Sequence, residues 1–328
     1  MTAIDVFNGD ADGLCALHQL RLAEPRESVL VTGVKRDIAL VAEVETRVRR
    51  AGGAGIAAGD ELTVLDISLD KNRDALLALL ERGVGARYFD HHFPGEIPTH
   101  ENLETHIDTD AETCTGLIVD AHLGGRYRPW AVTAAFGDNL LRAASAAAEP
   151  LGLDAAGLET LKTLGTLLNY NGYGASLDDL FFAPDALYAR LRPYADPFDF
   201  VAEEDAFATL EEGYRDDMAR AEALAPERAD ERTALYRFPN APFARRVGGV
   251  YANALAQRHP ERAHALLTED ANGDYVVSVR APLANRSGAD ELCRQFESGG
   301  GRRAAAGVNR LPAADVERFA KALAAQYP

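Results

Sequence analysis

The chain begins with a segment that joins an apolar run to two carboxylates, Ile4-Asp5-Val6-Phe7-Asn8-Gly9-Asp10-Ala11-Asp12-Gly13. Its first part, Ile4–Phe7, is rich in residues that favour strands. A helical pattern over Gly13–Leu22 follows almost at once, and the glycines between the two allow a tight turn. The segment therefore predicts the first strand and helix of an α/β fold, with acidic residues in the turn between them.

The same alternation continues over the following residues. Short apolar runs at 29–34, 62–67 and 86–89 alternate with helical patterns at 38–48 and 75–80. Parallel strands need such helical crossovers, so we expect consecutive βαβ units in a parallel sheet. Two of these runs lead into an acidic residue, Asp66 and Asp90. In open α/β sheets, ligands bind at the carboxyl ends of the strands.

The rest of the chain predicts a helical region and a second α/β domain. Helical patterns dominate 115–168, and the proline-bearing stretch 183–197 interrupts them before a helix whose apolar face runs from Phe207 to Leu224. Strand patterns at 234–238, 263–267 and 275–279 then alternate with helical patterns at 247–257 and 290–296. We expect an N-terminal parallel-sheet domain at 1–194, a helical linker at 195–230 and a smaller C-terminal α/β domain at 231–328.

Composition narrows the class of protein. The chain has 328 residues, of which 47% are hydrophobic and 26% charged, so it is expected to fold as roughly two globular domains. Its 34 basic and 51 acidic residues give a net charge of −17, which argues against a general duplex-DNA binder. The three cysteines form no CxxC pair, and no run approaches a membrane span or a signal peptide, so the expected address is the cytoplasm.

Acidic and imidazole side chains gather at the expected sheet edge. Asp10 and Asp12 follow the first strand, Asp66 ends another, and Asp90-His91-His92 ends a third. A single Asp-x-Asp at a turn is usually a helix cap. Carboxylates from three neighbouring strands would repel one another, however, and a pair of divalent metal ions would neutralise them.

These segments together resemble four motifs of the DHH phosphoesterase superfamily. The Asp10-Ala11-Asp12-Gly13 turn, the strand-end Asp66 and the literal Asp90-His91-His92 resemble the first three motifs, and Ala135-Phe136-Gly137-Asp138 resembles the fourth. The segments Val277–Arg280 and Gly299–Gly307 resemble a strand and a glycine-rich loop of the C-terminal domain associated with DHH proteins. The resemblance spans nearly the whole chain, except for about 145–230.

The resemblance implies roles for individual residues. It implies two Mn²⁺ ions, with Mg²⁺ or Co²⁺ as alternatives, and Asp66 as the bridging ligand. Asp90 would orient the ring of His91, and His92 would face the substrate phosphate. The implied metal ligands are Asp10, Asp12, Asp66, His91 and Asp138; the implied catalytic residues are His92, Asp66 and Asp90; the implied substrate-binding residues are Arg280, Gly299, Gly300, Gly301, Arg302 and Arg303.

Two positions depart from the family pattern. Members usually carry a histidine four residues before the first Asp of the turn, where this chain has Val6. That metal position would then be filled differently, through Asn8 or water. The C-terminal loop usually reads Gly-Gly-Gly-His, and here Arg302 stands in the place of the histidine. An arginine still binds phosphate, so this change would alter substrate choice more than it would abolish binding.

The resemblance thus implies a metal-dependent phosphoesterase acting on short nucleotides, either oligoribonucleotides or 3′-phosphoadenosine 5′-phosphate. Residues 276–310 hold six arginines against three acidic residues, a local excess of positive charge that suits a phosphate clamp. The metals would lie on the N-terminal domain, and the C-terminal domain would hold the substrate across a cleft. An exopolyphosphatase and a catalytically degenerate nucleotide-binding regulator remain as alternatives. No membrane or duplex-DNA partner is expected, and the oligomeric state, a homodimer included, is left open.

Overall fold

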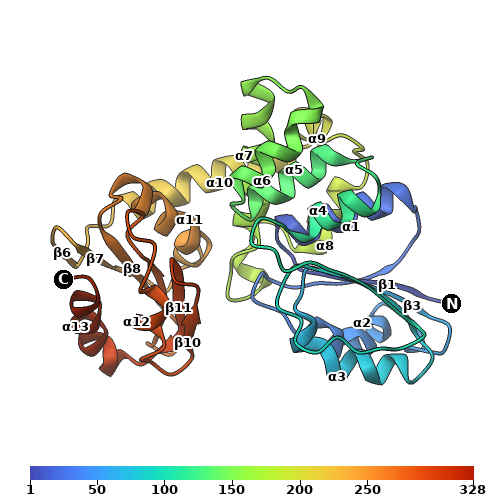
Figure 1. Ribbon diagram of the computed structural model, residues 1–328, viewed down its shortest axis with the longest axis horizontal. Helices are drawn as coiled ribbons and strands as arrows, with labels where there is room; N and C mark the ends of the chain where they lie inside the picture. Colours follow the sequence, from blue (N-terminus) through green and yellow to red (C-terminus); the bar gives the residue numbers. More distant parts are fainter. The chain divides into compact units, whose positions relative to one another are not determined.

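The computed structural model describes residues 1–328 and divides them into two compact units, Met1–Glu212 and Gly213–Pro328 (Figure 1). The division falls inside helix α10 (Asp205–Glu222), within the segment 195–230 for which a linker is expected. The expected α/β class, with a parallel sheet and a smaller second α/β domain, is confirmed. None of the helices combines the length and the apolar character that a membrane crossing requires.

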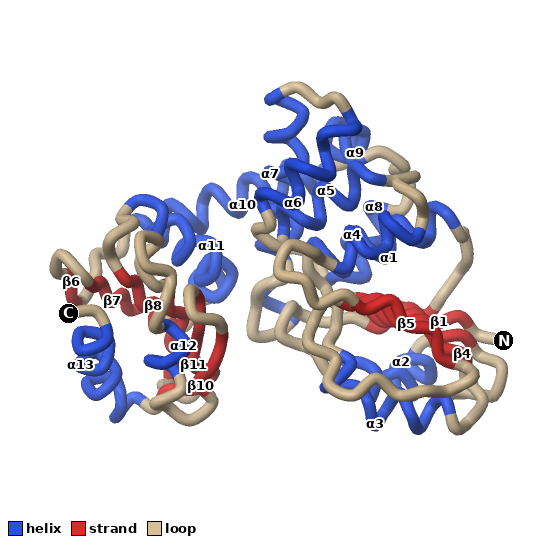
Figure 2. Tube along the Cα trace, in the orientation of Figure 1, coloured by secondary structure: helices blue, strands red, loops and turns tan.

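The first unit is built on a sheet of five parallel strands in the order β2-β1-β3-β4-β5. Helices α2 and α3 cover one face of this sheet, and α1 and α4 cover the other (Figure 2). The inner strand β1 is buried on both faces, as its apolar sequence predicts. The strands are β1 (Ala3–Phe7), β2 (Val29–Val31), β3 (Glu61–Leu65), β4 (Gly85–Asp90) and β5 (Leu103–Ile107), and the helices are α1 (Ala11–Ala23), α2 (Val44–Arg50), α3 (Leu69–Leu80) and α4 (Thr115–His122).

A layer of further helices completes the first unit: α5 (Arg128–Gly137), α6 (Leu141–Ala148), α7 (Ala155–Asn171), α8 (Pro184–Leu191) and α9 (Pro197–Glu203). The expectation that prolines interrupt the helices at 183–197 is wrong. Pro184 and Pro197 instead begin α8 and α9, where a missing backbone N–H costs no helical hydrogen bond. Helices α5 and α7 pack so closely that a Cβ on Gly165 would lie 2.3 Å from the carbonyl oxygen of Thr133.

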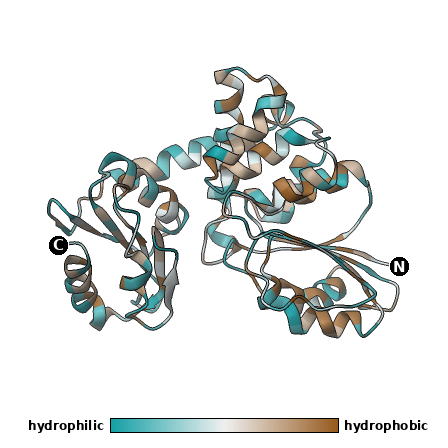
Figure 3. Ribbon diagram, in the orientation of Figure 1, coloured by the Kyte–Doolittle hydropathy of each residue, from teal (hydrophilic) through white to brown (hydrophobic).

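The second unit contains a six-stranded sheet in the order β10-β11-β9-β8-β7-β6, in which only β7 and β8 pair in parallel. Helix α13 carries apolar and polar residues (Figure 3), and its buried residues include Phe319 and Leu323. The strands are β6 (Arg228–Ala229), β7 (Thr233–Phe238), β8 (Ala263–Glu269), β9 (Tyr275–Arg280), β10 (Gly299–Gly301) and β11 (Ala305–Leu311), and the helices are α11 (Pro242–Arg258), α12 (Ala289–Cys293) and α13 (Val316–Gln326).

Candidate metal centre

The turn after β1 fixes the first two carboxylates. Asp10 caps α1, and its Oδ1 accepts hydrogen bonds from the backbone N–H groups of Asp12 (3.1 Å) and Gly13 (3.2 Å). The glycines of this turn are required by close approach of backbone: a Cβ on Gly9 would lie 2.1 Å from the carbonyl oxygen of Gly33, and one on Gly13 would lie 2.2 Å from that of Asn8. The turn therefore holds Asp10 and Asp12 at the carboxyl end of β1.

Asp12 is oriented by the start of helix α4. Its Oδ2 accepts from the backbone N–H of Thr115 (2.8 Å), and its Oδ1 accepts from that of Gly116 (2.7 Å). Since each oxygen accepts one backbone hydrogen bond, each keeps capacity to bind a metal.

Asp66 follows β3 in the left-handed backbone region, with φ of 59°. The Thr115 hydroxyl donates to its Oδ1 at 3.3 Å. Burial raises the pKa of Asp66 well above its usual range, and the nearby carboxylates of Asp12, Asp10, Asp138 and Asp90 raise it further. A non-glycine residue in this conformation, placed among like charges, is a costly arrangement that is typical of functional sites.

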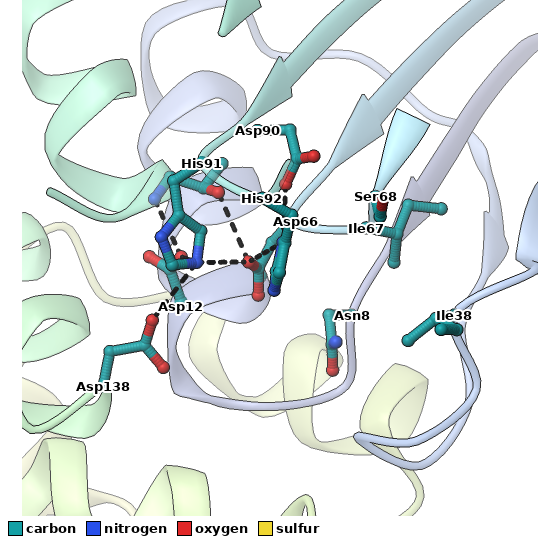
Figure 4. A network of polar contacts seen from close by, with 12 residues as sticks. Asn8, Asp12, Ile38, Asp66, Ile67, Ser68, Asp90, His91, His92 and Asp138 are labelled. Carbon is teal, nitrogen blue, oxygen red and sulfur yellow. Dashed lines mark hydrogen bonds and ion pairs between the residues drawn. The ribbon is translucent and has the colours of Figure 1, made fainter. Parts of the chain in front are cut away.

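His91, which follows β4, points its ring into the cluster (Figure 4). Its Nε2 lies 3.9 Å from Oδ2 of Asp12, 3.5 Å from Oδ1 of Asp66 and 3.4 Å from Oδ2 of Asp138. Asp138, at the C-terminal end of α5, has its pKa raised by burial and by the charges of Asp12 and Asp10, against the opposing effect of Lys35. The structure thus brings all five predicted metal ligands to one edge of the sheet.

His92 and Asp90 form a pair beside this cluster. Nδ1 of His92 lies 2.8 Å from Oδ1 of Asp90 and 3.8 Å from Oδ1 of Asp66. Asp90 therefore contacts the ring of His92, whereas the resemblance implies a contact with His91. Burial lowers the pKa of His92, but the hydrogen bond and charge of Asp90 outweigh this effect and leave that pKa raised. With Nδ1 engaged and the side chain 41% exposed, Nε2 is the ring atom left to meet a ligand.

The sequence analysis missed three side chains of this site. Thr115 contacts both Asp12 and Asp66, and Lys35 and Asn169 contact each other beside Asp10. Lys35 lies shortly after β2, which pairs with β1, so the reasoning that singled out strand-end residues could have identified it. Thr115 and Asn169 come from helices whose docking no local pattern reveals.

Val6, the position where family members carry a histidine, lies away from the carboxylates. Its side chain is fully buried in the apolar core with residues that include Val31, Leu40 and Val64. Asn8, the alternative named for that metal position, lies near the cluster (Figure 4), and its buried Oδ1 has no hydrogen-bond partner. Asn8 therefore offers an oxygen for a ligand, and Val6 does not.

The donor set fits a divalent metal ion. Two groups of side chains, Asp12-His91-Asp138 and Asp66-His91-His92, each have ligand atoms within 4.8 Å of one another. Four carboxylates with one or two imidazoles suit Mn²⁺ or Mg²⁺ better than ions that prefer thiolates. Oδ2 of Asp90, beside the cluster, is a further buried oxygen that has no hydrogen-bond partner.

The predicted substrate-binding residues belong to the second unit. Gly299, Gly300 and Gly301 form the edge strand β10, which corrects the expectation of a loop there. Arg280 ends β9, and its Nε donates to Oδ1 of Asn253 at 2.6 Å. Arg302 and Arg303 are exposed in the turn between β10 and β11, and Arg280 pairs with Ala305 at the same end of the sheet.

Comparison with solved structures identifies proteins of the same fold. An exonuclease RecJ bound to manganese matches with a TM-score of 0.63 at 18% identity over 100% of this chain and 91% of that one. RecJ from Thermus thermophilus in complex with Mn²⁺ matches with a TM-score of 0.66 at 20% identity, over 99% of this chain and about half (52%) of that one. PggH from Vibrio cholerae, a pGpG-specific phosphodiesterase, matches with a TM-score of 0.53 at 16% identity, over 99% and 98% of the two chains.

These likenesses confirm the fold that the DHH resemblance implies. Comparison with protein-family models and with curated protein sequences gives no match.

Proposed function

We propose that this chain, which has the fold of the DHH phosphoesterases, is a metal-dependent hydrolase of phosphoester bonds in short nucleotides. The observation that carries the proposal is the convergence of His91 Nε2 with the carboxylates of Asp12, Asp66 and Asp138 at 3.4–3.9 Å. Three of these residues follow separate strands or turns at one sheet edge, and Asp138 comes from α5. A purely structural role would not require so many like charges at one buried place.

The residues that would hold the ions, proposed as two Mn²⁺, are Asp10, Asp12, Asp66, His91 and Asp138. Such ions supply an activated water and neutralise the charge that develops on the leaving oxygen. The chain's own residues then orient the substrate. Nε2 of His92 donates to a phosphate oxygen, while Asp90 fixes the ring through Nδ1.

A linear dinucleotide is the first substrate we propose, because the similar PggH is a pGpG-specific phosphodiesterase. In the second unit, Arg302 and Arg303 are exposed and make no side-chain ion pair, so they are available to a phosphate. Arg280 adds a third guanidinium at that end of the sheet. The bisphosphate 3′-phosphoadenosine 5′-phosphate offers a similar pattern of charge and is the second substrate to test. The three cysteines are buried free thiols, which suits a cytoplasmic site of action.

The test is a substrate panel with a metal measurement on the same protein. Purified chain, stripped with EDTA and reloaded with Mn²⁺, is assayed on pGpG, other dinucleotides, 3′-phosphoadenosine 5′-phosphate, a cyclic dinucleotide and polyphosphate. We expect Mn²⁺ binding and turnover of a linear dinucleotide. Metal binding without turnover of any of these would favour the nucleotide-binding regulator, and turnover of polyphosphate alone would favour the exopolyphosphatase.

A further inference from the structure

The ammonium group of Lys35 lies among the proposed metal ligands. Its Nζ forms an ion pair with Oδ2 of Asp10, lies 3.5 Å from Oδ1 of Asp138 and donates to Oδ1 of Asn169 at 2.8 Å. A lysine ammonium has three donors, and all three have an oxygen within reach. A positive charge from the chain itself therefore occupies one side of the carboxylate cluster.

The main chain holds Lys35 at this place. Its backbone N–H donates to the carbonyl oxygen of Gly172 at 2.8 Å, and its own carbonyl accepts from Nδ2 of Asn8 at 3.3 Å. Gly172 in turn lies so close to Asp10 that a Cβ on Gly172 would be 3.0 Å from the Cβ of Asp10. The backbone is thus fixed from two directions, and only rotation of the side chain can remove the ammonium group.

The two oxygens of Asp10 have different partners. Oδ1 accepts the two backbone N–H groups of the helix cap, and Oδ2 contacts Lys35. A metal ion that uses Oδ2 must therefore compete with Nζ. The other side of the cluster is free of this competition, since Oδ2 of Asp138 faces His91 while only Oδ1 faces Lys35.

We propose that Lys35 competes with one of the two divalent ions, so that the centre binds a first ion tightly and a second ion weakly. The proposal rests on the metal-dependent function proposed above. The first ion would use Asp12, Asp66, His91 and Asp138. The second would need Asp10 and the displacement of the Lys35 ammonium. Lys35 would then keep Asp10 paired when only one ion is bound, and would make full loading depend on metal concentration.

Calorimetric titration of the full-length chain with Mn²⁺ tests this proposal. For the wild type we expect two unequal sites. Lys35→Met removes the charge and keeps an apolar stem, and it should tighten the weaker site by at least about tenfold while changing the stronger site far less. Lys35→Arg keeps the charge and should keep the weaker site weak. Lys162→Met, which removes a half-exposed lysine paired only with Glu159, controls for the change in net charge.

Electron paramagnetic resonance of the wild type gives a second measurement that needs no variant. Below one equivalent of Mn²⁺, unequal sites predict the six-line signal of an isolated ion, and the signal of a coupled pair should appear only with excess metal. A coupled pair below one equivalent, or equal affinities in wild type and Lys35→Met, would overturn the role of Lys35 and leave the phosphoesterase proposal standing. Failure of both proteins to bind Mn²⁺ would overturn the phosphoesterase proposal itself.

Discussion

At the scale of single residues, Asp66 combines a left-handed backbone with a carboxylate that faces four others. Asparagine is among the residues that best tolerate this backbone conformation, and it nearly matches aspartate in shape. Asp66→Asn should therefore remove a charge without distorting the turn after β3. We expect turnover to fall on the order of 100-fold or more, because a neutral amide is a weaker metal ligand than a carboxylate.

The metal-free stability of Asp66→Asn should equal or exceed that of the wild type, since repulsion within the cluster is relieved. Thermal unfolding in EDTA checks this point, and turnover of a dinucleotide with Mn²⁺ checks the first. Asp108→Asn is the matched control, because Asp108 is an exposed carboxylate just past the end of the edge strand β5 of the same sheet. Turnover that is equally reduced in both variants would contradict a specific role for Asp66.

At the scale of elements, a buried ion pair joins β1 to α1. Nε and Nη2 of Arg21 lie 2.8 and 2.5 Å from the carboxylate of Asp5, and the two side chains are 6% and 0% exposed. Ser28 adds a hydrogen bond to Asp5 at 2.6 Å. Arg21→Met would leave Asp5 buried without its main partner, so we expect a loss of about 3–5 kcal/mol in the free energy of unfolding.

Urea unfolding of Arg21→Met, monitored by a spectroscopic signal that reports on the first unit, measures this loss of stability. The double variant Asp5→Leu with Arg21→Met should recover much of the stability, because an apolar pair of similar volume carries no unpaired charge. A double variant that is no more stable than Arg21→Met would show that packing, and not the uncompensated carboxylate, causes the loss.

The elements also show how far sequence patterns reach. Strands β1, β2, β3, β4, β7, β8 and β9 were predictable, because each lies in an apolar run with turn residues near its ends. Strand β5 was not, since Leu103–Ile107 is a half-exposed edge strand whose apolar residues are few. Strand β10 consists of three glycines, and only its pairing with β11 makes it a strand.

The same limit applies to the candidate site. The five residues proposed as metal ligands stand at strand or helix ends within recognisable motifs, so they could be singled out before their distances were known. Thr115 and Asn169 become visible only when separate elements dock around Asp10 and Asp12, whereas Lys35 lies shortly after a strand and could have been singled out by its place in the sequence. The partner of Asp90 was likewise a matter of geometry, because His91 and His92 are neighbours in sequence and only the fold decides which ring it contacts.

At the scale of the whole molecule, each unit contains a buried neutral histidine. Burial lowers the pKa of His18 to about 4, and it does the same for His264. Nε2 of His18 donates to the carbonyl oxygen of Tyr194 at 2.8 Å, and the buried ring of His264 lies beside the ring of His259. The unfolded chain takes up protons near pH 6.5, so each unit should lose stability as pH falls from about 6.5 toward about 4.

The expected loss at pH 5 relative to pH 7.5 is about 2 kcal/mol for each histidine. Unfolding of each unit at the two pH values measures it, with EDTA present so that metal binding does not contribute. His18→Gln should reduce the pH dependence of the first unit only, and His264→Gln that of the second unit only. A pH dependence that neither variant changes would assign acid sensitivity to other groups.

Charge is distributed unevenly between the units, and this bears on substrate length. Of the chain's 34 basic and 51 acidic residues, the first unit holds 17 and 36 and the second holds 17 and 15. The unit that carries the candidate metal centre is thus strongly anionic. Phosphates beyond those held by arginines would meet acidic surface, and charges interact over only about 8 Å at physiological salt.

Affinity should therefore level off or fall as the substrate lengthens, and the dependence of log Kd on log salt should stay near the slope of about 1 expected for one or two phosphate contacts.

Arg302→Ala should raise KM for a dinucleotide by about tenfold or more, because a charge-assisted phosphate contact is lost. Arg310→Ala is the control, since its guanidinium already pairs with Asp274 at 2.7 Å. The deciding assay compares dinucleotides with single-stranded 20-mers. Efficient, processive degradation of the 20-mer that is insensitive to Arg302→Ala would contradict the short-substrate proposal and favour an exonuclease activity like that of RecJ.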